Sequence, residues 1–405
     1  MTQLILEIVF WFGILCFAHT YFFYPLILRV LAKSKSENQD VFQDPDAFPP
    51  VFVLMSVYNE AAVIHAKINS LLRLDYPFDK LSIWIGSDCS SDGTNAVLEG
   101  YTSKDSRIHF FPFTNRRGKP LVINELAERA MQSHAIGEDE GLPVFLITDA
   151  NVILARQTLK ELVKHFKNEK IAVVDAHMIH TGIQAEGISQ AEDRYISAEV
   201  QLKHREGIVW GRMIGPFGGC YAVRSDYFTP VPDNFLVDDF FITLKALERG
   251  GYAISELKAV CYEPVSHEIA VEYRRKARIS AGNFQNMATF RRLWMPPWRS
   301  SLHFAFFSHK VLRWIAPFLI VASGLSCGLL ALYPLNLFYR YSFVFLTAAC
   351  IGLPLMDKAL ARVGLHLRLL RAMRYFLLMN IALVEGFFKY LKGIKNNVWE
   401  PTKRQ

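Results

Sequence analysis

Residues 51–57, VFVLMSV, form an unbroken apolar run that leads into the polar turn Tyr58-Asn59-Glu60. An apolar run of this length is typical of a β-strand that is buried on both faces, as in a parallel sheet covered by helices. Residues 64–72 then place apolar side chains on one helical face, and Asn59 is a candidate N-cap of that helix. A buried strand followed directly by an amphipathic helix indicates an α/β architecture.

The same alternation of strand and helix signals continues to about residue 263. Further strand signals are LSIWIG (81–86), IHFFPF (108–113), VFLIT (144–148) and IAVVDA (171–176), with helical segments near 120–130 and 156–166. We therefore predict a mostly parallel α/β sheet. Ligands of such sheets bind outside the carboxyl ends of the strands, so the functional residues are expected there.

The composition indicates a membrane protein. Of the 405 residues, 51% are hydrophobic, and they are concentrated in a few segments. Residues 4–31, 311–332 and 337–356 are each long and apolar enough to cross a bilayer of about 30 Å. A cleaved signal peptide is the alternative for the first segment, but the basic start and small-residue cleavage site of such peptides are missing.

The distribution of Lys and Arg predicts the orientation of these spans. No basic residue precedes the first span, whereas Arg29, Lys33 and Lys35 follow it, so residues 31–301 are expected in the cytoplasm. Basic residues also follow the last apolar run, which favours a re-entrant or surface helix at residues 375–392 over another full span. We thus predict a multi-pass protein of the cytoplasmic membrane. The net charge of +7 would then attract the protein to anionic lipid. No nucleic-acid partner is expected.

Polar residues follow three of the predicted strands, at the point where each strand ends. They are Asn59 and Glu60 after VFVLMSV, Asp88 after LSIWIG, and Asp149 and Asn151 after VFLIT. Any one of them could be a helix cap or a turn former. Carboxylates gathered at one rim repel each other unless a cation or a donor-rich ligand is bound. Asp149 and Asn151 offer the oxygen ligands that a hard cation such as Mg²⁺ takes, together with phosphate oxygens and water.

Seven short motifs occur in order along residues 50–285. They are SVYNE, SDCSSDGT, RRGKPLVIN, TDAN, GPFGGCYAVR, VDDF and RRKARISAGNFQ. With these motifs in this order, one span before them and several after, the chain resembles the membrane-bound family 2 glycosyltransferases. The resemblance implies a GT-A fold, an enzyme of the hexosyltransferase type, and a nucleotide-sugar donor, most often a UDP-sugar.

The resemblance also implies roles for residues on the donor side. Asn59 and Glu60 would lie near the nucleoside, Asp88 would contact the base or ribose, and Lys119 would approach the nucleotide. The loop at residues 116–119 is basic and contains a glycine, which suits an anionic ligand. The alternative for this loop is a solvated basic turn.

Asp149 matches the first aspartate of the family's metal-binding motif, so the resemblance implies Mg²⁺ or Mn²⁺ as the cofactor. Asn151 stands where the motif has its second aspartate. A neutral residue there lowers the charge of the ligand set, and weaker metal binding is expected.

The acceptor side is assigned to two other motifs. Asp239 takes the position of the family's catalytic base, and Asp238 replaces a glutamate. On local grounds alone, the pair would be favourable partners of the N-terminal dipole of the following helix. By the resemblance, Gly218, Gly219 and Asp238 would line the pocket for the acceptor and the donor sugar. For the two glycines, a tight turn is the alternative.

Arg275 and Arg278 lie on one helical face and are expected to bind the diphosphate. Processive polysaccharide synthases carry Gln-x-x-Arg-Trp here, whereas this chain keeps the arginine and lacks the glutamine and the tryptophan. Processive synthesis is therefore not supported. A lipid-contacting helix beside the membrane is the alternative for this segment.

We conclude that the sequence predicts an inverting glycosyltransferase acting on a polysaccharide or a lipid-linked saccharide at the membrane, where it could have membrane-complex partners. The alternative is a catalytically inactive, sugar-nucleotide-binding subunit of a polysaccharide synthesis or export complex. The predicted domains are a transmembrane helix (1–32), a linker (33–49), a GT-A domain (50–290), an interfacial segment (291–310), a C-terminal membrane region with two spans plus a third span or re-entrant helix (311–393), and a basic cytoplasmic tail (394–405).

Overall fold

The computed structural model describes residues 1–136, 141–183, 189–265, 268–333, 336–363, 365, 367–394 and 397. By its internal contacts the chain divides into two compact units. The sheet unit contains Leu31–Gly182 and Ser197–Val265, and the helical unit contains Met1–Val30, Ile183–Ile196 and Ser266–Gly393. Both units are therefore assembled from segments that are far apart in the sequence.

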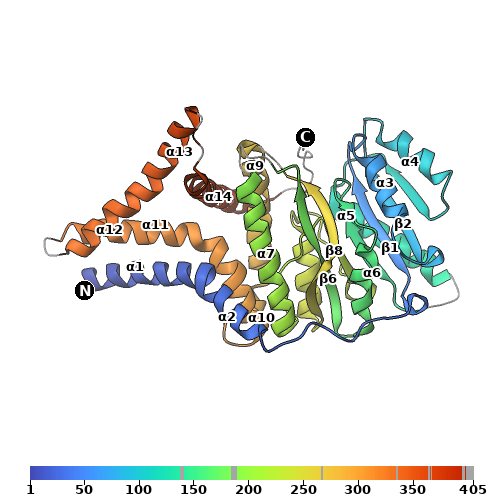
Figure 1. Cartoon of the computed structure of the whole chain (residues 1–405), viewed down its shortest axis with the longest axis horizontal. Coiled ribbons are helices and arrows are strands. Elements are labelled where there is room, and N and C mark those ends of the chain that lie inside the picture. The colour runs from blue at the N-terminus through green and yellow to red at the C-terminus, as the bar shows by residue number, and fades with distance from the viewer. Residues whose placement is uncertain are drawn as a thin grey trace. The chain divides into compact units, whose positions relative to one another are not determined.

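The sheet unit is built on one mixed sheet. Its strands are β1 (Val51–Val57), β2 (Leu81–Asp88), β3 (Ile108–Phe113), β4 (Val144–Thr148), β5 (Ile153–Leu154), β6 (Ile171–Thr181), β7 (Cys220–Arg224) and β8 (Tyr252–Pro264). Within the described residues they are arranged in the order β3-β2-β1-β4-β7-β6-β8-β5 (Figure 1). The first four strands in this order are parallel to one another, whereas β7 is antiparallel to both β4 and β6.

The predicted α/β sheet is confirmed, with two refinements. Apolar runs correctly predicted β1, β2, β3, β4 and β6, but the antiparallel β7 and the short β5 make the sheet more mixed than expected. The pattern also did not predict β8, because this strand alternates between buried and exposed side chains and contains several charged residues. Its parallel pairing with β6 becomes evident only in the assembled sheet.

Helices cover both faces of the sheet. They are α3 (Ile64–Leu72), α4 (Thr94–Thr102), α5 (Lys119–Ile136), α6 (Thr158–Val163), the second part of α7 (Ser189–Trp210), and α8 (Asp238–Glu248). One face forms a core with α3, α4 and α6. On the other face α5 approaches β2 closely, because a β-carbon on Gly86 would lie 2.4 Å from Val122. Ligand sites of such sheets form outside the carboxyl ends of the strands, between the helices of the two faces.

The helical unit contains the apolar segments of the chain. Its helices are α1 (Thr2–Ala18), α2 (Tyr24–Ala32), α9 (Ile269–Thr289), α10 (Ser301–Phe306), α11 (Leu312–Ala331), α12 (Leu337–Thr347), α13 (Leu353–Arg362) and α14 (Arg368–Leu391), with the first part of α7. One-turn π-helical segments at His19–Phe23, Phe307–Val311 and Ala348–Gly352 join α1 to α2, α10 to α11 and α12 to α13.

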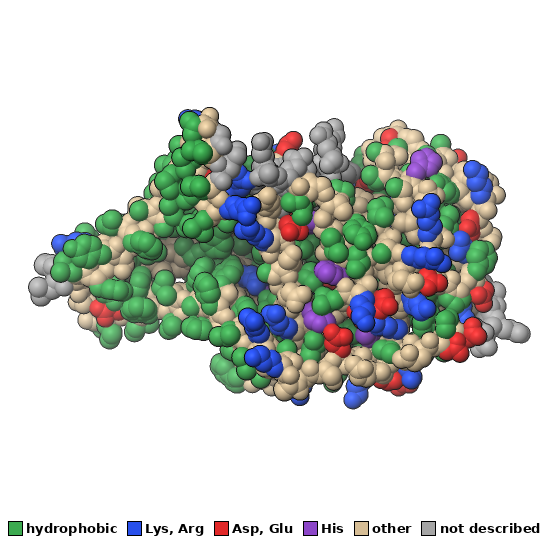
Figure 2. Space-filling view, in the orientation of Figure 1, with side chains coloured by type: hydrophobic (Ala, Val, Ile, Leu, Met, Phe, Trp, Pro, Cys, Tyr) green, Lys and Arg blue, Asp and Glu red, His purple; other side chains and the backbone are tan. Residues whose placement is uncertain are grey.

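Three of the resulting continuous helices, among the residues described, are long and apolar enough to cross a membrane. They are Thr2–Ala32, Ser301–Ala331 and Leu337–Leu360, which coincide with the three predicted spans. Large apolar side chains are exposed along them, and they dominate this part of the surface in Figure 2. Because an exposed apolar surface of this extent is unfavourable in water, it suggests membrane association. The orientation of the spans and the placement of α14 remain predictions.

Candidate active site

The site lies in the sheet unit, at the carboxyl ends of β1, β2 and β4. Three different chain segments meet there. Lys119 begins α5, Asp149 follows β4, and Asp238 and Asp239 begin α8. The structure therefore brings together four of the residues predicted from the motifs, although they are distant in sequence.

Asp88, the last residue of β2, holds the basic loop that leads into α5. Its Oδ1 accepts the Arg117 backbone N–H at 2.6 Å, and its Oδ2 accepts the Gly118 N–H at 3.0 Å and the Arg116 Nε–H at 3.2 Å. The Arg116 guanidinium also lies over the Tyr58 ring, 3.3 Å from its centroid. These hydrogen bonds to the buried Asp88 carboxylate fix the conformation of the loop. Its predicted contact with the base or ribose remains a prediction.

Asn59 is not the N-cap of α3, contrary to the sequence-based expectation. The helix begins at Ile64, and Asn59 precedes it in a left-handed conformation with φ of 53°. Its Oδ1 accepts the Ser91 backbone N–H at 2.8 Å, and its own N–H donates to Ser90 Oγ at 3.1 Å. Asn tolerates this backbone conformation better than most residues, which lets it connect the loops after β1 and β2. The proximity of Asn59 and Glu60 to a nucleoside remains a prediction.

Lys119 is the cation that holds the carboxylates of the site together. Its Nζ lies 2.7 Å from Asp149 Oδ1 and 3.7 Å from Asp238 Oδ2. Burial acts to lower the pKa of Lys119, but Asp149, Asp238 and Asp239 together raise it well above its usual value. The ammonium group therefore stays charged and neutralises part of the negative charge around it.

Asp239 has the properties of a general base. Its Oδ2 accepts the Gly218 backbone N–H at 3.1 Å, and a β-carbon on Gly218 would lie only 2.8 Å from this oxygen. Burial, followed by the neighbouring Asp238 carboxylate, raises the pKa of Asp239 from 3.8 to about 7, and Lys119 counteracts part of this effect. A base is most effective when its pKa lies near the working pH. The glycine at position 218 is thus needed for the close approach that positions this carboxylate.

The raised pKa of Asp239 leads to a pH prediction. Because only the deprotonated carboxylate can accept a proton, kcat/KM should fall about tenfold per pH unit below pH 7 and level off above it. The measurement is the initial rate at limiting donor between about pH 5.5 and pH 8.5. Circular dichroism over the same range checks that the chain stays folded. A flat profile across this range would contradict the assignment of Asp239 as the base.

A buried lysine supports the turn after β4, and the sequence analysis did not identify it. Lys67 Nζ donates to Thr148 Oγ1 at 2.7 Å and to the Val152 carbonyl at 2.6 Å. Thr148 Oγ1 and the Asp149 backbone N–H both donate to the Gly219 carbonyl. Burial lowers the pKa of Lys67 to about 8. A lysine on the apolar face of the α3 segment was the available signal, because such positions rarely hold an unpaired cation.

Asn151 is fixed by a residue from β8. Its Nδ2 donates to Glu263 Oε1 at 3.2 Å, and Glu263 is buried. Among the described residues, no group of three or more His, Cys, Asp and Glu side chains is arranged to hold a metal ion. A cation bound between Asp149 and Asn151 would therefore need further oxygen ligands from a substrate or from water.

Arg275 and Arg278 belong to α9 in the helical unit. There the Arg275 guanidinium donates to both oxygens of the buried Glu272 at 3.4 Å. Their binding to a diphosphate remains a prediction.

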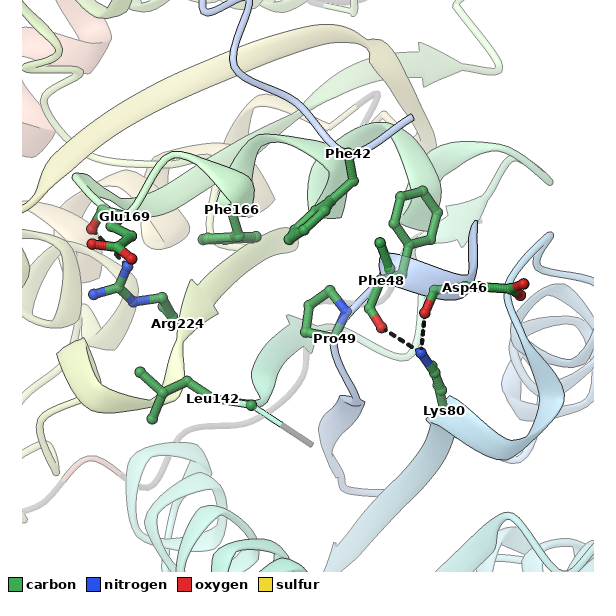
Figure 3. A pocket seen from close by; sticks show the side chains of 11 residues that line it. Phe42, Asp46, Phe48, Pro49, Lys80, Leu142, Phe166, Glu169 and Arg224 are labelled. Atoms are coloured by element: carbon green, nitrogen blue, oxygen red, sulfur yellow. Dashed lines mark hydrogen bonds between the residues drawn. The ribbon is translucent and has the colours of Figure 1, made fainter. Parts of the chain in front are cut away.

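A separate cavity of about 430 Å³ lies at the amino ends of the strands, on the opposite edge of the sheet (Figure 3). The Phe42 and Phe166 rings line it, and its cations are already engaged. Lys80 Nζ donates to the carbonyls of Asp46 and Phe48 at 2.6 and 3.0 Å. Arg224, also in the lining, donates to the Glu169 carbonyl and the Asp226 carboxylate. Lys80 and Arg224 of this lining are therefore both bonded to groups of the protein.

The mixed sheet and the helices that cover it define a protein of the GT-A fold. The chain is similar to the solved mannosyltransferase PcManGT from Pyrobaculum calidifontis, with 24% identity, a TM-score of 0.66, and 95% of this chain and 99% of that chain covered. At this level of identity the similarity establishes the fold.

The family is established by the sequence comparisons. The family described as "Glycosyl transferase family 2" matches residues 52–227, and "Glycosyl transferase family group 2" matches residues 144–356. The chain belongs to the family 2 glycosyltransferases, as the motifs predicted.

Two curated relatives match parts of the chain. The beta-monoglucosyldiacylglycerol synthase of Synechocystis sp. is 22% identical over 285 residues, which cover 67% of this chain and 55% of that protein. The poly(ribitol-phosphate) beta-N-acetylglucosaminyltransferase TarS of Staphylococcus aureus is 25% identical over 150 residues, covering 37% of this chain and 24% of that protein. The chain thus spans about half the length of the first relative and a quarter of the second.

Proposed function

We propose that this glycosyltransferase moves a sugar from a nucleotide-sugar donor, with inversion, to a saccharide or lipid-linked acceptor at a membrane. The observation that carries the proposal is the cluster around Lys119. A charged ammonium group lies among carboxylates from β4 and α8, next to a carboxylate whose pKa is near 7. Such a site can hold an anionic leaving group on one side and accept a proton on the other.

Asp239 accepts the proton of the acceptor hydroxyl in this proposal. The Gly218 N–H fixes one of its oxygens, and its side chain is partly exposed, so a hydroxyl can reach it. Asp238 is buried beside Asp239, and its carboxylate helps to raise the pKa of Asp239 to a value suited to proton transfer near neutral pH. Proton removal by a carboxylate while the sugar carbon is attacked is also the mechanism of inverting glycosidases.

Lys119 acts on the leaving group. In the structure its ammonium group is shared between Asp149 and Asp238, at 2.7 and 3.7 Å. A diphosphate that binds at this rim offers stronger acceptor oxygens to the same ammonium group. The loop that Asp88 orders adds two arginines next to Lys119, which strengthens the attraction for an anion.

A divalent cation, Mg²⁺ or Mn²⁺, fits the donor set of the turn after β4. Asp149 supplies a carboxylate with a partly exposed side chain, and Asn151 supplies an amide oxygen, so a hard cation could use both with phosphate oxygens and water. When bound, it would neutralise charge that develops on the leaving diphosphate. Arg275 and Arg278 of α9 are proposed as further diphosphate contacts.

The names of similar proteins guide the choice of donors to test. The solved mannosyltransferase is in complex with GDP-Man and Mn²⁺, and the relatives are named for transfer of glucosyl and N-acetylglucosaminyl groups. A panel should therefore contain GDP-mannose, UDP-glucose and UDP-N-acetylglucosamine. A total membrane-lipid extract, with and without a diacylglycerol supplement, serves as the acceptor.

The test measures nucleotide release by the detergent-purified full-length chain. Release from one donor is expected with Mg²⁺ or Mn²⁺ and an acceptor extract, and its loss is expected in EDTA. The control is an Asp105→Asn variant, since the Asp105 carboxylate pairs with Arg107 in a turn outside the site. Tight donor binding without any turnover would instead favour the inactive-subunit alternative, and the absence of binding for every donor would refute both.

A further inference from the structure

The amide of Asn151 has one orientation that its surroundings permit. Its neighbour is a carboxylate, Glu263, at 3.2 Å. In the structure the amide presents its NH₂ group to Glu263 Oε1, the orientation in which a carboxylate oxygen accepts the hydrogen bond. The amide oxygen, Oδ1, then remains on the other side of the group and is the atom that can bind a cation.

Both partners of this contact are held firmly. Glu263 is 4% exposed and lies in β8, paired in register with His180 of β6. Asn151 lies in the turn between β4 and β5, and the carbonyl of the next residue, Val152, accepts a hydrogen bond from the buried Lys67. The backbone that carries each of the two side chains is therefore fixed, by the pairing of β8 with β6 and by the turn that Lys67 supports.

We propose that Glu263 is a positioning residue that aims the Asn151 amide oxygen at the cation site and supplies, one contact further out, the negative charge that a second aspartate would carry. The proposal rests on the metal-dependent transfer proposed above. It explains how a neutral residue at position 151 remains compatible with a divalent cation. The carboxylate belongs to Glu263, which contacts the ligand residue Asn151 and does not itself occupy the ligand position. Hydrogen-bond partners of metal ligands strongly affect metal affinity.

The test exchanges the two groups. Glu263→Gln removes the charge and allows the amide of Asn151 to adopt either orientation, so Mn²⁺ affinity should fall about tenfold or more. Asn151→Asp/Glu263→Gln places the carboxylate at position 151 and the amide at position 263. Because a glutamine NH₂ can donate to an aspartate, this double variant should recover the affinity of the natural chain to within about threefold.

The readouts are Mn²⁺ binding by electron paramagnetic resonance, with GDP or UDP present, and the Tm of the metal-free protein. Asn151→Asp alone brings two carboxylates into contact, so its Tm should fall, and Glu263→Gln should restore it in the double variant. This non-additive change in Tm does not depend on metal or on activity. The matched control is Glu256→Gln, a buried glutamate of β8 that binds His165 and Lys164 instead. Its Mn²⁺ affinity should not change.

Three results would overturn this inference alone and leave the proposed metal dependence standing. The first is an Mn²⁺ affinity of Glu263→Gln equal to that of the natural chain. The second is an Mn²⁺ affinity of the double variant as low as that of Glu263→Gln. The third is a change in the Tm of the double variant equal to the sum of the changes in the two single variants. Failure of the natural chain to bind Mn²⁺ with either nucleotide would instead refute the proposed metal dependence, and with it this inference.

Discussion

Replacing Asp239 with asparagine should lower kcat about a thousandfold, while the affinity for the donor changes little. The asparagine keeps the size of the side chain and can be held near the Gly218 N–H, but it cannot accept the proton of the acceptor hydroxyl. General base catalysis contributes about 10² to 10⁴ in rate, and the raised pKa of Asp239 places it near the optimum for this role. The measurement is single-turnover transfer at saturating donor, together with donor binding by calorimetry.

The Asp105→Asn variant is the control for a general effect of removing a carboxylate. It should retain its activity, because its salt bridge with Arg107 at 2.7 Å lies outside the site. Comparable kcat values for Asp239→Asn and the natural chain would show that another group takes the proton. A loss of donor affinity as large as the loss in kcat would mean that Asp239 binds the donor instead.

Replacing Lys119 with methionine should lower kcat/KM by about 10² to 10³, which is the cost of removing one charged group that stabilises a developing anion. The change has a second consequence. Since Lys119 lowers the pKa of Asp239, the acid side of the pH profile should move above pH 7 in the variant. Donor affinity should fall as well, because the diphosphate loses a charge-assisted partner. The measurements are kcat/KM as a function of pH and the Kd of the donor.

The matched control is Lys245→Met, since Lys245 forms a surface salt bridge with Glu248 in α8 at 2.8 Å. That variant should keep both the rate and the pH profile. Lys119→Arg should retain part of the donor affinity, because it keeps the positive charge. An unshifted pH profile in Lys119→Met, with a normal fold, would contradict the electrostatic link between Lys119 and Asp239.

Local signals in the sequence predicted elements that depend on continuous segments. The apolar runs at β1 and β4 needed only their own residues to indicate buried strands. The membrane-length helices were predicted for the same reason, because length and hydropathy are properties of one segment. The antiparallel β7 and the long β8 were less evident, since their pairing partners are far away in the chain.

At the site too, some features could be predicted from the sequence, whereas others depend on contacts between distant segments. Motif order identified Asp149, Asp239 and Lys119 by resemblance, but their contacts depend on how β4, α5 and α8 meet. The pKa of Asp239 near 7 follows from burial and from a neighbouring carboxylate, and neither is a property of the VDDF motif by itself. Asn59 was assigned wrongly as a helix cap because its real partners, Ser90 and Ser91, belong to the loop after β2.

By itself, the sequence determined the class of the sheet, the three apolar helices and the family, because these depend on composition and order along the chain. Only the tertiary structure decided that Lys119 lies among carboxylates from different segments. It also decided that Lys67 binds Thr148 at the turn after β4 and that Glu263 contacts Asn151. These contacts join residues about 30 to 120 positions apart, and electrostatic interactions act through space at short distances, independently of sequence separation.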